Sequence, residues 1–160
     1  MIARTRFRIN GWSTRGSALV ELAVVMPVLI LVFAAAIDFS RVFYMSNVLI
    51  AAARAGAQYG TKDAGSYTDD AGMTAIATTV VTTSLSGAAP TVTPSHLCEC
   101  VNDSGGAGAP PTPACTAACT SGHMVIHVSV AVNKSFSTVM SVPGIPTGLS
   151  LTRTATIRSQ

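Results

Sequence analysis

Residues 17–37 read SALVELAVVMPVLILVFAAAI, and this apolar stretch decides how the rest of the chain is organised. A helix needs about 20 predominantly apolar residues to cross the hydrocarbon core of a bilayer, and this stretch is long enough. Glu21 is its only charged side chain. A carboxylate in a spanning helix costs about 2.5–3.5 kcal/mol on insertion scales, so Glu21 is a candidate functional residue. Pro27 removes one backbone hydrogen bond, which predicts a kink or a loosened turn.

The positive charge of the chain is concentrated before this stretch. The 160 residues carry a formal net charge of +3, but four of the ten basic residues lie in residues 1–16, where there is no acidic residue. Without this basic leader, six basic and seven acidic residues remain, so no basic surface for nucleic acid is expected. Basic flanks stay on the cytoplasmic side of a membrane, which predicts a cytoplasmic N-terminus and an exported C-terminal part.

Helical periodicity continues beyond the apolar stretch. Apolar residues recur at intervals of three and four through residues 38–60, and Gly60 is a plausible end of the helix. At 1.5 Å per residue, a helix over residues 17–59 would be about 65 Å long. A second helix is expected over residues 69–85, with Asp69 and Asp70 favourable at its N-terminus. Its β-branched TTVVTT run leaves a strand as the alternative.

The remainder of the chain, residues 61–160, predicts a small exported domain. Residues 86–121 are rich in Gly, Pro, Ala, Ser and Thr, and we expect an irregular loop there. Residues 124–132 and 149–157 alternate in the manner of strands. The predicted fold class is therefore α+β: a long membrane-spanning helix, a second helix, and an antiparallel sheet of at least two strands.

All four cysteines fall in the predicted loop, at Cys98, Cys100, Cys115 and Cys119. On the exported side disulfides persist. A bridge between Cys98 and Cys100 would be strained, so pairs across the loop are favoured, for example Cys98 with Cys119 and Cys100 with Cys115. A zinc site is the alternative, but one residue between Cys98 and Cys100 is tighter than the usual spacing of structural zinc ligands.

The start of the apolar stretch resembles the TadE-like family of the tight-adherence (Flp-type) pilus system, which is prepilin-like. The resemblance rests on GSALVELAVVMPVLIL at residues 16–31, IDFSRVFY at 37–44 and AAARAGAQYG at 51–60, and more weakly on LSLTRTATI at 149–157. It implies that a prepilin peptidase cuts between Gly16 and Ser17. It also implies that Glu21 pairs with the new Ser17 amine of a neighbouring subunit during assembly.

Two features distinguish this chain from the major subunits of such pili, which are very short and have tyrosine after the glutamate. Here Leu22 follows Glu21, and 100 residues follow Gly60. The resemblance therefore implies a minor pilin or pseudopilin of the bacterial inner membrane, with its C-terminal domain in the periplasm or, after assembly, on the pilus or cell surface. The implied partners are the prepilin peptidase, other pilin subunits, the pilus assembly platform and membrane lipid.

Two other interpretations use the same residues. The apolar stretch could be an unprocessed anchor for an exported binding domain, with Glu21 a tolerated interfacial carboxylate. Alternatively, Ala34-Ala35-Ala36 resembles a signal-peptidase site, and cleavage there would release a soluble protein that begins at Ile37.

The small residues Ala52, Gly56 and Gly60 form a ridge that could contact either another helix or the protein's own strands. No arrangement typical of a catalytic site, cofactor site or small-molecule site is recognisable. His96, His123 and His127 lack a ligand spacing, and His127 is expected on the polar face of a strand. We expect a structural protein and no enzyme.

Overall fold

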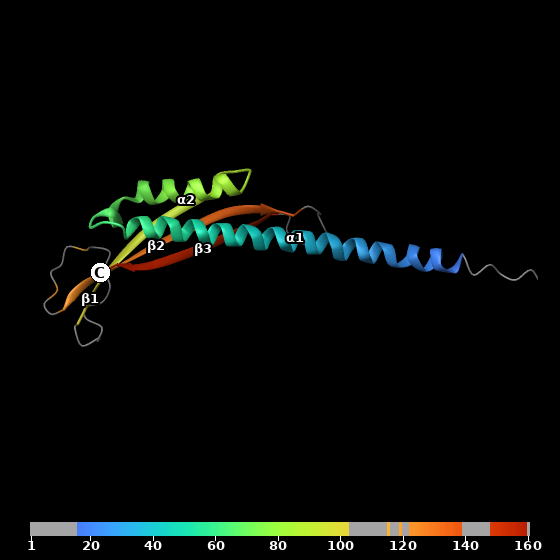
Figure 1. Ribbon diagram of the computed structural model, residues 1–160, viewed down its shortest axis with the longest axis horizontal. Helices are drawn as coiled ribbons and strands as arrows, with labels where there is room; N and C mark the ends of the chain where they lie inside the picture. Colours follow the sequence, from blue (N-terminus) through green and yellow to red (C-terminus); the bar gives the residue numbers. More distant parts are fainter. Residues whose placement is uncertain (1–15, 103–114, 116–118, 120–121, 139–147, 160) are drawn as a thin grey trace, which may run out of the picture. The chain divides into compact units, whose positions relative to one another are not determined.

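The computed structural model describes residues 16–102, 115, 119, 122–138 and 148–159, and Figure 1 shows the elements they form. The contacts divide the chain into two compact units, Met1–Ile37 and Asp38–Gln160, each of which is described by itself. The predicted α+β class is confirmed. The elements are α1 (Ser17–Gly60), a 3₁₀ turn η1 (Ser66–Thr68), α2 (Asp70–Ser84), β1 (Thr91–Val101), β2 (His123–Ser137) and β3 (Gly148–Ser159).

The first unit consists of the beginning of α1. The helix continues through Pro27, and its end at Gly60 is the predicted one. Its large apolar side chains are exposed over residues 18–37, with Val24 at 72% and Phe33 at 66%. The helix is long and apolar enough to cross a membrane, and none of its most apolar window is buried inside the protein. Such a surface requires an apolar environment or partner helices.

The second unit is built on a three-stranded antiparallel sheet in the order β1-β2-β3. Because side chains alternate along a strand, one face of β2 carries Val128, Val130 and Val132, all fully buried. The two strands predicted over residues 124–132 and 149–157 are confirmed as β2 and β3, which extend further at both ends. The core combines this valine row with small and apolar side chains of both helices: Leu49, Ala52, Ala53 and Ala57 of α1, and Met73, Ala77 and Val81 of α2.

The TTVVTT run lies in helix α2, so the strand alternative is wrong. The buried residues of α2 are Met73, Ala77 and Val81, which are spaced four apart along one face of the helix. The threonine hydroxyls bond back to the preceding turn, as Thr79 Oγ1 does to the Ala75 carbonyl at 2.8 Å. Burial of the apolar face therefore outweighs the weak helix preference of threonine.

The expectation of an irregular loop over residues 86–121 is wrong for residues 91–101, which form β1. β1 pairs with β2 over its whole length, from Thr91 opposite Asn133 to Val101 opposite His123. Pro94 lies inside it, and proline is accepted there because β1 is at the edge of the sheet. The strand forms through long-range pairing, which the turn-rich local composition did not indicate.

Candidate functional site

The predicted processing site lies where α1 begins. Gly16 occupies a turn and Ser17 is the first helical residue. The Gly16 carbonyl accepts a hydrogen bond from the Val20 amide at 3.3 Å, the first bond of the helix. A Cβ added at Gly16 would meet nothing within 4 Å. The fold therefore does not require glycine at this position, and any requirement must come from a molecule that acts on this segment.

Glu21 lies one turn into α1, with its side chain exposed among exposed apolar residues. Leu19 and Val20 on the preceding turn are 69% and 65% exposed. Within the part of the chain that the structure describes, Glu21 forms no ion pair. Its carboxylate is thus placed beside the start of the helix without an intramolecular partner among those residues. Cleavage at Gly16 and pairing of Glu21 remain predictions.

The small-residue ridge of α1 is used inside the protein. Ala52 is fully buried in the core. A Cβ added at Gly56 would lie 3.1 Å from the Met73 carbonyl oxygen, and one at Gly60 would lie 2.8 Å from Cγ1 of Val128. The glycines therefore let α1 approach α2 and β2 closely. Of the two interpretations of this ridge, the contact with the protein's own elements is the one that forms.

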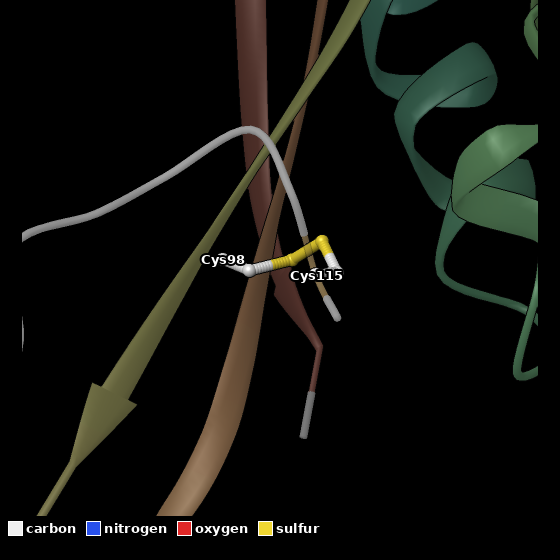
Figure 2. The surroundings of a disulfide bond; sticks show 2 residues. All are labelled: Cys98 and Cys115. Atoms are coloured by element: carbon white, nitrogen blue, oxygen red, sulfur yellow. A yellow bond between two sulfur atoms is a disulfide. The ribbon is translucent and has the colours of Figure 1, made fainter. Parts of the chain in front are cut away.

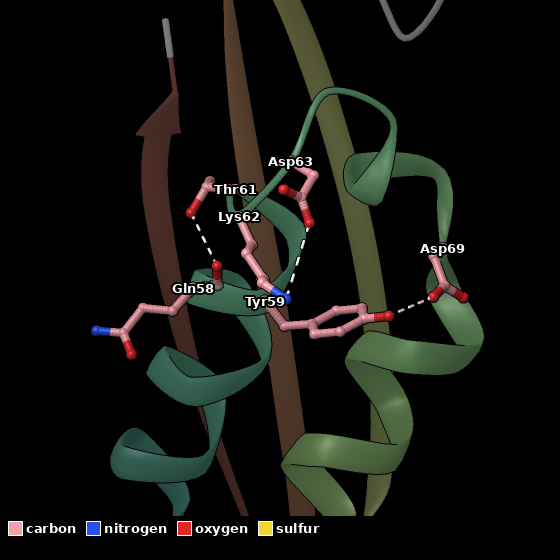
Figure 3. Close-up of polar contacts among 6 residues, drawn as sticks. All are labelled: Gln58, Tyr59, Thr61, Lys62, Asp63 and Asp69. Carbon is pink, nitrogen blue, oxygen red and sulfur yellow. Dashed lines mark hydrogen bonds and ion pairs between the residues drawn. The ribbon is translucent and has the colours of Figure 1, made fainter.

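A hydrogen-bonded junction joins the end of α1 to the start of α2 (Figure 3). The Tyr59 hydroxyl donates to Asp69 Oδ2 at 2.7 Å, while Asp69 Oδ1 accepts from the Gly72 amide at 2.9 Å and caps α2. The bonds from the Gly72 amide and from Tyr59 lower the pKa of the Asp69 carboxyl. The same carboxylate, as hydrogen-bond acceptor and as neighbouring charge, raises the pKa of the Tyr59 hydroxyl. The sequence indicates Asp69 as a helix start, but no local pattern indicates its partner Tyr59, which lies ten residues earlier.

Two disulfides connect β1 to the segment that follows it. One joins Cys98 to Cys115, with a Cα–Cα distance of 5.3 Å (Figure 2). The other joins Cys100 to Cys119, with a Cα–Cα distance of 5.6 Å. Pairing across the loop is thus as expected, but the example of Cys98 with Cys119 and Cys100 with Cys115 is wrong. The observed pairs join the cysteines in the same order along both segments, the first with the first and the second with the second.

The bonded sulfurs also bear on the zinc alternative, since a disulfide sulfur is no thiolate ligand. Among the residues that the structure describes, there is no cluster of three or more His, Cys, Asp or Glu side chains that could hold a metal ion. His127 Nε2 lies 3.4 Å from Glu99 Oε2 across β1 and β2, a partly exposed pair. The His96 ring packs edge-on against Tyr67, with ring centroids 5.2 Å apart.

Two basic side chains that sequence analysis did not single out are placed on the helix-facing side of the sheet. Lys134 of β2 is only 5% exposed, and its ammonium donates to the Ala88 carbonyl. Arg153 Nε of β3 donates to Ser46 Oγ of α1 at 2.8 Å, which ties the last strand to the long helix. The alternation of each strand predicts the face of these residues, but their partners depend on the packing of helices onto it.

The comparisons with known proteins concern the N-terminal part of the chain. Neither a curated protein nor a solved structure matches the chain. One family model matches, over the segment that contains Gly16, Ser17, Glu21 and Pro27. It covers about the same stretch as the resemblance at residues 16–60, and residues 59–160 lie outside it. Residues 16–58 are thus a TadE-like segment, matching the family described as TadE-like protein.

Proposed function

We propose that the protein is a minor pilin or pseudopilin of a tight-adherence (Flp-type) pilus and secretion system. The observation that supports this most is the TadE-like match over residues 16–58, which begins at the residue before α1. In this proposal α1 is inserted in the bacterial inner membrane with the basic leader in the cytoplasm and the unit Asp38–Gln160 in the periplasm. The role is structural, in pilus assembly or adhesion.

A prepilin peptidase removes residues 1–16 in this proposal. Small residues at the scissile bond suit a peptidase that needs an extended backbone, and glycine adopts such conformations readily. Cleavage gives Ser17 a free ammonium group close to the membrane surface. Glu21 of one subunit pairs with this amine on a neighbour, and the pairing offsets the cost of both charges in an apolar environment.

The test of processing is N-terminal sequencing of the protein from cells with an active prepilin peptidase. We expect Ser17 as the first residue, and full-length precursor in cells that lack the peptidase. A Gly16→Val variant should remain unprocessed, although a side chain at Gly16 meets nothing within 4 Å and should not disturb the fold. Gly11→Val, within the leader but away from the bond, is the matched control and should be cut normally.

The same experiment separates the alternatives. A mature N-terminus at Met1 in the presence of an active peptidase would support an unprocessed single-pass protein that displays a binding domain. A mature N-terminus at Ile37 would support signal-peptidase cleavage after Ala36 and a secreted soluble protein. Either result would reject the pilin proposal.

The role of Glu21 is tested separately by Glu21→Gln, which keeps the side-chain volume but removes the charge. We expect this variant to be cut after Gly16 and inserted, yet to be lost from cross-linked complexes with other pilin subunits. Asp38→Asn, beyond the apolar stretch, is the control for loss of a carboxylate on the same helix. Normal assembly of the Glu21→Gln variant would remove the proposed pairing while leaving processing intact.

A further inference from the structure

In the second unit, the surface has a hollow between α1, the C-terminal end of α2 and the C-terminal end of β2. Two adjoining hollows of about 350 and 340 Å³ share Arg41, Met45, Ser86 and Phe136 in their linings. We call the two hollows together the Arg41–Lys134 groove, since Lys134 lines the second one. All of these residues belong to the unit Asp38–Gln160.

The groove has the chemistry of an anion site. Its lining contains two cations and several hydroxyls, among them Tyr44, Ser84 and Ser135, and no carboxylate among the described residues. Hydroxyls and cationic side chains are the donors that bind phosphate oxygens.

Lys134 is the less usual of the two cations, because lysine is almost never buried unless it is paired with an opposite charge. Only 5% of it is exposed, and among the described residues its hydrogen-bond acceptor is the neutral carbonyl of Ala88. A carbonyl satisfies one N–H but does not compensate the charge. A bound anion would compensate it.

Arg41 is held at the groove but its charge is only partly neutralised. Its guanidinium lies 5.2 Å above the Phe136 ring, and its Nη1 is 3.5 Å from Asp38 Oδ1. The Arg41 side chain is 47% exposed, so this pair is weak. With one acidic group beside two cations, the groove keeps a net positive charge.

The position of the groove along α1 suggests the source of the anion. Arg41 lies only four positions after Ile37 in the sequence, so it belongs to the segment that directly follows the apolar stretch. The headgroup layer extends about 5–7 Å beyond the hydrocarbon core on each side. Phe39, Phe43 and Tyr44 beside Arg41 are 73%, 62% and 56% exposed, as interfacial aromatic side chains are.

We propose that the Arg41–Lys134 groove binds the headgroup phosphate of an anionic phospholipid in the membrane that α1 spans. The two cations and the lining hydroxyls contact the phosphate, and the apolar side chains of Met45 and Phe136 lie beside the glycerol and upper acyl chain. The bound lipid holds the exported domain at the membrane surface. This proposal depends on membrane insertion of α1, and not on cleavage after Gly16 or on pilus assembly.

The test uses the full-length protein in detergent and native mass spectrometry with three probes: short-chain phosphatidylglycerol, short-chain phosphatidylcholine and inorganic phosphate. We expect phosphatidylglycerol to bind more tightly than phosphatidylcholine, and inorganic phosphate not to displace it at equal concentration. Arg41→Gln should lower the affinity for phosphatidylglycerol by about 10-fold, the cost of one charged hydrogen bond. Arg54→Gln, an exposed arginine further along α1, is the matched control and should bind like the wild type.

Lys134→Met supplies a second variant, since methionine keeps most of the stem volume, and circular dichroism establishes that it folds. The folded variant should lose affinity as Arg41→Gln does. Equal losses in Arg41→Gln and Arg54→Gln would mean non-specific attraction to basic charge and would overturn the site. Displacement by equal inorganic phosphate, or unchanged binding in Arg41→Gln, would overturn it as well. None of these readouts requires processing, so the pilin proposal can fail independently.

Discussion

Gly60→Ala tests whether the close approach of α1 to the sheet stabilises the unit Asp38–Gln160. The added methyl would lie 2.6 Å from Sδ of Met73 and 2.8 Å from Cγ1 of Val128. Ordinary contact between carbon atoms begins at about 3.5 Å, so the Val128 methyl would have to recede by about 0.7 Å. The Met73 side chain can rotate away, but Val128 is β-branched and fully buried in the central strand.

The expected magnitude follows from two opposing effects. Overpacking a well-packed core costs about 1–3 kcal/mol, whereas replacing glycine by alanine in a helix gains about 0.5–1 kcal/mol. The gain applies to the middle of a helix, and Gly60 is the last residue of α1, so the overpacking cost dominates. We therefore expect Gly60→Ala to lower the free energy of unfolding by about 1–2 kcal/mol. Gly148→Ala is the control, because a Cβ there meets nothing within 4 Å, and its effect should stay within about 0.5 kcal/mol.

The assay is urea-induced unfolding of the full-length protein in detergent, followed by the near-ultraviolet circular dichroism of its tyrosines. Oligomeric state is measured in parallel. If Gly60→Ala is as stable as the wild type, the reasoning about internal packing is refuted. If it is as stable and also weakens association between copies, the ridge is a contact between helices of different molecules.

Four further predictions use the same unfolding assay. Replacing Cys98 and Cys115 together by serine should lower the free energy of unfolding by about 2–4 kcal/mol, because the disulfide restricts the unfolded chain. A double variant that is as stable as the wild type in oxidising buffer would contradict this effect. The pKa of Asp69 is lowered in the folded state, so the ionised carboxylate stabilises the fold above pH 3.8, and this stabilisation is lost as the pH falls through the folded-state pKa. Asp69→Asn should therefore flatten the loss of stability in acid. An unchanged pH profile would contradict a stabilising role of the Tyr59–Asp69–Gly72 junction. The raised pKa of Tyr59 gives stability present below 10.0 and lost above it as the hydroxyl ionises, so Tyr59→Phe should abolish the alkaline loss. Leu49→Ala, which empties a fully buried site, should cost about 2–5 kcal/mol, and a smaller loss would mean that the site collapses around the cavity.

The features predictable from sequence are those specified locally. The limits of α1 follow from an apolar run and a terminal glycine, and β2 and β3 follow from the alternation of apolar and polar residues. These three elements were predicted without knowledge of the elements that pack against them. The candidate processing residues Gly16 and Ser17 and the candidate assembly residue Glu21 lie within six consecutive positions, so a linear motif is enough to select them. Their detection required no fold.

The failures concern residues whose structure depends on distant partners. β1 contains Pro94 and closely spaced cysteines, which are typical of loops, and it is a strand because β2 supplies its hydrogen bonds. The cysteine pairs likewise join β1 to residues 17 and 19 positions further along the chain. In α2, tertiary burial of one face decided between helix and strand.

The sequence by itself determined the membrane-length helix, the α+β class and the TadE-like segment, because periodicity and composition act over a few turns or a few strand residues. Only the tertiary structure decided that Gly56 and Gly60 pack inward, that the Tyr59 hydroxyl donates to the Asp69 carboxylate, and that Arg41 and Lys134 line one groove. These arrangements bring together residues of different helices and strands. Their free energies come from close packing and hydrogen bonds, which exist only when helices and sheet are brought together.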